Sequence, residues 1–143
     1  MAIFSAEQMF SDAQAITASA ASTNIIDLGA PGTPHGGAAA LTRDIGKGTP
    51  IPVLIQVTAA FNNLTSLKVA IEVDDNSGFS SATEVASETI VLANLTAGKQ
   101  SHLMYVPQGT NERYMRVYYT VTGTAPTTGT VDAGITMGNQ TNV

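Results

Sequence analysis

Hydrophobic and polar residues alternate from Ile51 onward, which is the pattern of strands that bury one face. Clusters of Gly, Pro, Asn and Asp separate these runs at intervals of roughly ten residues, as turns do. The expected strands are residues 22–28, 51–59, 67–73, 84–86, 89–92, 100–106, 113–122 and 131–137. This pattern predicts an all-β fold, a jelly roll or β-sandwich of about eight short antiparallel strands. An immunoglobulin-like sandwich and an open Greek-key barrel show similar patterns and stay as alternatives.

The alternation also predicts pairing and side-chain direction. Asn62 and Asn63 lie between the strands at 51–59 and 67–73, so these two strands are expected to form a hairpin. In the strand at 113–122, Tyr119 is expected to face the core. Tyr114 and Tyr118 are expected on the opposite face, with Arg116 between them and able to stack on either ring.

The first part of the chain has a different character. Residues 1–21 are expected to form an N-terminal arm that precedes a single β domain at 22–143. Apolar residues in 1–20 are spaced loosely as in a helix, and an extended arm with a short strand at 14–17 is the alternative. Residues 30–50 contain so many glycines and prolines that they predict a long loop. Loops of this length are usually functional or disordered, and we expect this one to be ordered by docking.

Composition narrows the classes of partner. Of the 143 residues only 12% are charged, and the net charge is −5. A surface of Thr, Ser, Ala, Asn and Gly costs little to desolvate, so another protein can cover it. Without a basic cluster there is no electrostatic basis for binding nucleic acid. Without a run of about 20 apolar residues we expect no membrane span, and we expect a soluble protein that is made in the cytoplasm.

Candidate chemistry is sparse. His35 in the loop and His102 in an expected strand belong to no catalytic or zinc motif. The acidic turn at 74–76 offers oxygen ligands for calcium, but its spacing does not match an EF-hand, so a structural turn is favoured. The chain lacks cysteine, which excludes thiolate nucleophiles and disulfides. We therefore expect a protein that is not an enzyme and has no catalytic residues, cofactor or metal.

Five segments, taken in order, resemble one known family. They are FSDAQAITASAASTNIIDLG at 10–29, RDIGKGTPIPVLIQVT at 43–58, VDDNSGF at 73–79, LANLTAGKQ at 92–100 and NERYMRVYYTVTGTAPTTGTVDAGI at 111–135. Together they resemble the capsid cement (decoration) proteins of tailed bacteriophages. The resemblance implies a jelly-roll protein that self-associates and binds across capsomer junctions on the outer capsid surface of the virion. Its implied partners are the phage major capsid protein and further copies of itself, as a dimer or a trimer.

Attachment is expected to involve the N-terminal arm and the long loop. Apolar residues outside the periodic domain rarely stay in water, and about twenty irregular residues need a partner to order them. The candidate interface residues are Ile3, Phe4, Met9, Phe10, Leu41, Arg43, Asp44, Ile45 and Lys47. The alternative for these segments is that both fold back onto their own domain. The alternative for the whole chain is a virion module that binds a receptor or carbohydrate.

Overall fold

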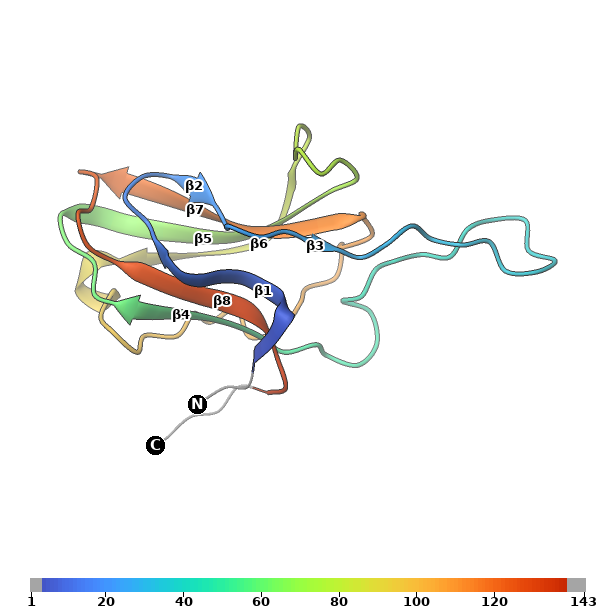
Figure 1. Ribbon diagram of the computed structural model, residues 1–143, viewed down its shortest axis with the longest axis horizontal. Coiled ribbons are helices and arrows are strands. Elements are labelled where there is room, and N and C mark those ends of the chain that lie inside the picture. The colour runs from blue at the N-terminus through green and yellow to red at the C-terminus, as the bar shows by residue number, and fades with distance from the viewer. Residues whose placement is uncertain (1–3, 139–143) are drawn as a thin grey trace.

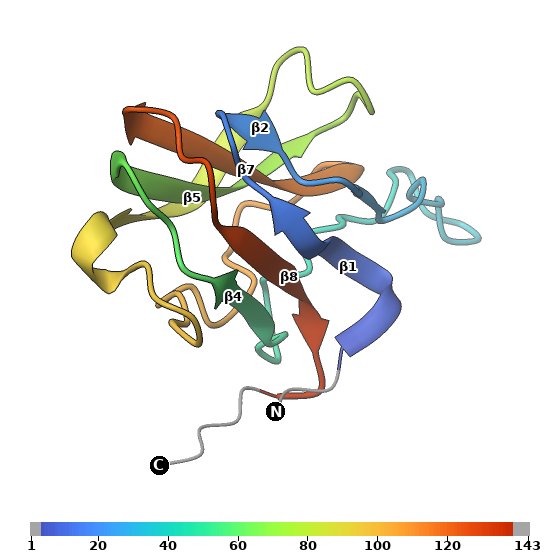
Figure 2. The same cartoon turned by 60° about the vertical axis from the view of Figure 1, so that its left-hand side comes forward.

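The computed structural model describes residues 4–138, which form two antiparallel sheets packed face to face (Figures 1 and 2). Sheet A contains, in spatial order, β1 (Phe4–Ala15), β8 (Thr130–Thr136) and β4 (Val53–Ala59). Sheet B contains β2 (Ala20–Ala21), β7 (Tyr114–Gly123), β5 (Leu64–Asp74) and β6 (Thr83–Val91), and β3 (Ile26–Asp27) also pairs with β7. The expected all-β sandwich is confirmed. Within 4–138 the one helix is η1 (Leu92–Asn94), and none is long or apolar enough to cross a membrane.

Residues 98–106, expected to contain a strand, lie along the free edge of β4 as an irregular segment. Ser101 N donates to Ile55 O at 2.8 Å, and Val106 N donates to Ile51 O at 3.0 Å. The segment thus takes a fourth position in sheet A, beside β4. β2 and β3, which both pair with β7, share one position in sheet B. Successive positions then alternate between the two sheets, except that β5 and β6 are neighbours in sheet B. Eight strand positions connected in this way make a jelly roll.

The expected hairpin of 51–59 with 67–73 is wrong. β4 pairs with β8 in sheet A, whereas β5 pairs with β6 and β7 in sheet B, so the connection at Asn62 and Asn63 crosses between the layers. Asn63 takes the left-handed conformation with φ 67°. The Asn62 side chain accepts from Thr127 N at 2.8 Å and Thr128 N at 3.1 Å, which ties this crossing to the β7–β8 connection.

The helical interpretation of the first twenty residues is also wrong. Phe4–Ala15 form β1, which pairs with β8 through several register shifts. The shifts break the strict alternation of a strand, so apolar positions such as Met9 and Phe10 fall side by side in sequence. Within the predicted arm at 1–21, Phe4–Ala15 are therefore the edge strand of sheet A, and Ala20–Ala21 form β2 in sheet B.

The core lies between the sheets and is built by the strands whose alternation is strongest. Val53, Ile55 and Val57 of β4 face the inward side chains of β5 and β7. Tyr119 is 0% exposed, as predicted, and its hydroxyl lies 2.8 Å from Ser11 Oγ of β1. This contact joins sheet B to sheet A inside the core.

Candidate interaction surface

The predicted long loop projects from one end of the sandwich (Figure 1). Residues 30–42, here called the finger, are all exposed, and Leu41 is 61% exposed. Leu41 N donates to Gly32 O at 3.0 Å, which joins the two limbs, and Gly37 N donates to Pro34 O at 2.8 Å at the tip. The finger contains no Asp, Glu, Lys or Arg. It is therefore a projecting hairpin of small and apolar residues.

Asp44 fixes one limb of the finger to the body. Its carboxylate accepts hydrogen bonds from Gly109 N at 3.0 Å, from Thr110 N at 3.3 Å and from Thr110 Oγ1 at 3.1 Å. The bond from Gly109 N, followed by those from Thr110, lowers the pKa of this carboxyl below its ordinary value. We call Asp44 and its partners at 109–110 the clasp.

Arg43, the residue before Asp44 on the same limb, links this limb to the start of the other one. Its guanidinium donates to Gly29 O, and its backbone N donates to Asn111 Oδ1 at 2.7 Å. Three residues further along the chain, Gly46 lies so close to the Pro107 carbonyl that a Cβ atom at Gly46 would overlap this carbonyl. The base of the finger is thus held against residues 107–111, while the finger itself extends beyond the body.

The nine predicted interface residues lie in different surroundings. Phe4 and Met9 are half-buried on β1, Leu41 and Lys47 are exposed, Arg43, Asp44 and Ile45 are half-buried at the base of the finger, and Ile3 lies outside the described residues. Ile45 packs against the core. Phe10 is 0% exposed in the core, so its side chain is not offered to a partner.

The outer face of sheet A carries few charges. Leu54 of β4, Gly134 of β8 and Met9 of β1 lie beside one another in register, and the Phe4 ring lies over Gly134. Tyr105 bridges to Pro52 at the end of this face and is 52% exposed. Leu54 is 3% exposed and Gly134 is buried, so the accessible part of this face comes from Phe4, Met9, Pro52 and Tyr105. We call the outer surface formed by these four residues the low-charge face. At an outward position of β8, the Asp132 side chain accepts a hydrogen bond from Ala13 N of β1 at 2.6 Å.

The outer face of sheet B carries charges that neutralise one another. Three ion pairs cross it: Lys68 with Glu84 at 2.6 Å, Arg116 with Glu72 at 2.8 Å and Arg113 with Asp27 at 2.9 Å. The two outer faces of the sandwich therefore differ in chemistry. Ion pairs cross sheet B, whereas the acidic or basic residues on β1, β4 and β8 are Glu7, Asp12 and Asp132, and none of these belongs to the low-charge face.

Arg116 is the centre of the ion-paired face. Its guanidinium lies 4.1 Å from the centre of the Phe79 ring and 5.2 Å from that of Tyr118. Tyr118 and Tyr114 lie outside the core as predicted, but Tyr114 is contacted by Arg113 at 5.0 Å rather than by Arg116. The second ring on Arg116 comes instead from the turn after β5, where Phe79 is buried with φ 50°.

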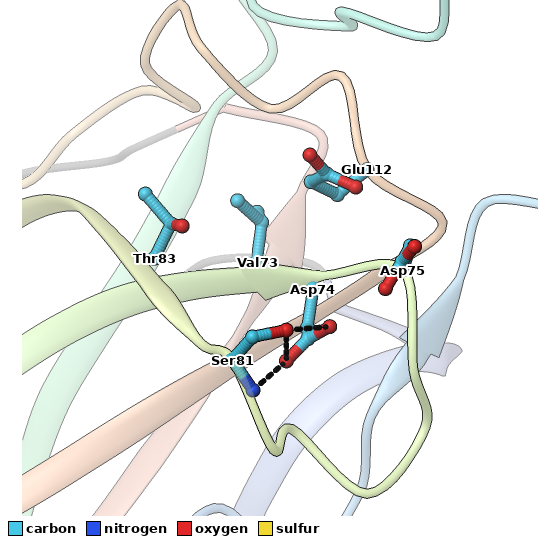
Figure 3. A pocket seen from close by; sticks show the side chains of 6 residues that line it. All are labelled: Val73, Asp74, Asp75, Ser81, Thr83 and Glu112. Atoms are coloured by element: carbon cyan, nitrogen blue, oxygen red, sulfur yellow. Dashed lines mark hydrogen bonds between the residues drawn. The ribbon is translucent and has the colours of Figure 1, made fainter.

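A polar pocket of about 270 Å³ lies where β5 and β6 meet that turn (Figure 3). Its lining residues are Val73, Asp74, Asp75, Ser81, Thr83 and Glu112. Asp74 is 2% exposed and accepts from Asn76 N at 2.9 Å and from Ser81 N at 2.8 Å. These bonds lower its pKa, the bond from Asn76 most strongly. The Asp74 carboxylate therefore organises the turn, as the structural interpretation predicted.

The other candidate chemical groups lie apart. His35 is in the finger, and the His102 side chain is 82% exposed with Nδ1 3.4 Å from Glu88 Oε1. Across residues 4–138, no three His, Asp or Glu side chains are grouped so that they could hold a metal ion.

The stability of the protein is expected to fall as the pH drops from about 4 towards 2. The side-chain hydrogen bond from Arg113, with the backbone bond from Gly29, lowers the pKa of Asp27 from 3.8 to about 2. A carboxyl with a lowered folded pKa contributes stability above its unfolded pKa, and loses it as the pH falls through the folded value. Asp44 and Asp74 act in the same direction. The melting temperature should be constant above about pH 5 and should decline below about pH 4. The decline should be less steep for the Asp27→Asn variant. A melting temperature that is constant down to pH 2 would contradict this.

Sequence reasoning missed Tyr105 and Met104 as surface residues, which are 52% and 44% exposed. Strict alternation in 100–106 put Tyr105 on one face and Met104 on the other. In the structure both are exposed, because the segment follows β4 irregularly while Ser101 and Val106 point inward. The only signal available was Pro107, which ends the run.

Comparison with known proteins gives one family. No curated protein matches the chain. The model of the Bbp16 family matches residues 10–135, a range that begins in β1, ends in β8 and includes the finger and its clasp. The match covers most of the 143 residues. The chain therefore belongs to the Bbp16 family.

Proposed function

We propose that this chain is a structural virion protein that binds the outside of the assembled capsid shell of a tailed phage and cements neighbouring capsomers. The observation that carries the proposal is the contrast between the two outer faces of the sandwich. The low-charge face has little to lose on desolvation, whereas the face with three ion pairs suits contact with solvent. The resemblance of the five sequence segments to cement proteins supports the same function.

Binding of this kind stabilises a shell by mass action. A protein that binds the assembled lattice and not the separate subunits favours assembly, by an amount that grows with its concentration. Each copy needs only a contact of ordinary size, on the order of 1,600 Å². Copies that self-associate as a dimer or trimer attach at several points and gain avidity. Light scattering on the isolated protein measures this association.

A receptor- or carbohydrate-binding module is the second candidate. Such modules stack sugars on exposed aromatic rings. Among the Phe and Tyr side chains of residues 4–138, only Tyr105 is more than one-third exposed. Tyr114 and Tyr118 lie against arginines on the opposite face. An isolated ring supports sugar stacking less well than a cluster does, so the cement function is favoured.

Replacing Tyr105 with glutamate is expected to weaken shell binding by at least about tenfold. The change places an unpaired carboxylate in the contact, and even 1.4 kcal/mol of uncompensated desolvation gives that factor. The measurement is co-sedimentation with purified, expanded, empty capsids. Thr122→Glu is the matched control, because Thr122 is exposed on the outer face of sheet B. It should bind like the unchanged protein.

The outcomes separate clearly. If the unchanged protein does not sediment with expanded capsids, the proposed function is wrong. If Thr122→Glu abolishes binding and Tyr105→Glu does not, the capsid contact lies on the ion-paired face. Both side chains are solvent-exposed, so both variants should melt close to the unchanged protein.

A further inference from the structure

The finger extends well beyond the area that the sandwich can cover. Residues 30–42 form two limbs of about six residues, and each extended residue spans about 3.3 Å, so the tip can reach roughly 20 Å from its base. Figure 1 shows it pointing along the long axis of the molecule, away from the sheets. A surface that binds both the low-charge face and the finger must therefore be broader than the sandwich.

The finger offers small side chains rather than strand-like backbone, because Pro31 and Pro34 have no N–H and the chain turns at 35–36 and bends at 38–39. Two backbone hydrogen bonds, Leu41 N to Gly32 O and Gly37 N to Pro34 O, lie within it. Its side chains are mostly those of Ala, Gly, Pro and Thr, and every residue is exposed. Small apolar and hydroxyl side chains cost little to desolvate, so they are suited to packing against an uncharged surface of another protein.

The base of the finger is held before any partner arrives. The Asp44 carboxylate receives three hydrogen bonds from residues 109–110, and Arg43 joins Gly29 to Asn111. Gly46 packs directly on Pro107. A segment fixed in direction loses less conformational entropy on binding than a free loop does. The clasp therefore makes the finger a prepared contact element.

We propose that the finger binds a second shell subunit, adjacent to the one under the low-charge face, by packing its small side chains against an uncharged surface of that subunit. The inference rests on the proposed function and adds to it the way in which one copy bridges two subunits. A bridge of this kind makes binding depend on the spacing of subunits in the assembled lattice, because both contacts must be reached at once.

The test is a variant that lacks the finger but keeps its base. Residues 33–40 are replaced by Gly–Gly, which joins Gly32 to Leu41 across a pair that is already hydrogen bonded. The clasp residues remain, so the melting temperature should be unchanged. Affinity for expanded empty capsids, measured by co-sedimentation, should fall by about 100-fold or more, since avidity between linked contacts is of that order.

Two controls identify the partner and the chemistry. Light scattering should show the same oligomeric state with and without the finger; loss of self-association would mean that the finger pairs with another copy of this chain, and would overturn the inference. Capsid binding through the finger should change little between low and high salt, because the finger contains no Asp, Glu, Lys or Arg. A steep salt dependence that disappears with the finger would contradict an uncharged contact.

The remaining results distinguish the inference from the function on which it rests. If the variant without the finger binds capsids as tightly as the unchanged protein, the bridge is wrong while the cement function stands. If neither protein binds, the cement function itself fails.

Discussion

Replacing Tyr119 with alanine is expected to lower the free energy of unfolding by about 3–5 kcal/mol, as removal of a buried aromatic side chain does. Tyr119 is among the largest side chains that are fully buried, and it lies on β7 in the centre of sheet B. Its hydroxyl is hydrogen bonded to Ser11 of β1, so the alanine variant loses packing and a bond between the sheets. Burial raises the pKa of the Tyr119 phenol above its ordinary value of 10, so the hydroxyl, protonated at neutral pH in any case, also stays protonated in alkaline solution.

Chemical denaturation of three variants resolves these contributions. Tyr119→Phe keeps the ring and removes only the hydroxyl, so it should lose about 1 kcal/mol. Tyr118→Ala is the matched control, because Tyr118 is half-buried on the outer face of the same strand. It should lose clearly less than Tyr119→Ala. The reverse order would mean that the two faces of β7 have been inverted.

The faces of β4, β5, β7 and β8 could be predicted from sequence because their alternation is long and uninterrupted. A shift of one residue would expose a whole row of Val, Ile and Leu, so burial determines which side faces in. Tyr119 illustrates this, since its neighbours Val117 and Val121 share its face. The class of the fold followed from the same signal.

The choice of strand partners could not be predicted in the same way. Alternation describes the inward face of β4, but its hydrogen bonds go sideways, to β8 and to residues 98–106. Nothing local distinguishes a hairpin with β5 from a crossing to the other sheet. The same limit applies to β1, where register shifts conceal the strand and Phe10 turns into the core.

The candidate surface was located only in part. Glycine and proline content predicted the loop, but it could not show that residues 43–46 are fixed to the body while 30–42 project from it. That division depends on the contacts of Asp44 with residues 109–110, more than sixty positions along the chain. The low-charge face could not be predicted for a similar reason. Gly134 meets β1, and Tyr105 meets Pro52 just before β4, only after folding.

The second large effect is expected at Gly129, where alanine should destabilise the protein by about 2–5 kcal/mol. Gly129 precedes β8, is buried, and has φ 130°, a conformation that side-chain-bearing residues rarely adopt. A Cβ atom there would overlap the ring of Phe61, which is itself 7% exposed and so has little room to move. Strain and overpacking therefore act together.

Gly98→Ala separates these two causes. Gly98 also has a positive φ, 88°, but a Cβ atom there meets nothing within 4 Å. Its substitution should therefore lose only the backbone contribution, about 1 kcal/mol. If chemical denaturation gave equal losses at Gly98 and Gly129, the Phe61 ring would have to be able to move aside. The Gly129 carbonyl also accepts from Ile16 N at 3.1 Å, which holds the start of β8 to the chain that follows β1. A larger loss at Gly129 than at Gly98 would therefore show that this end of the sandwich is tightly packed and that the Phe61 ring cannot move aside.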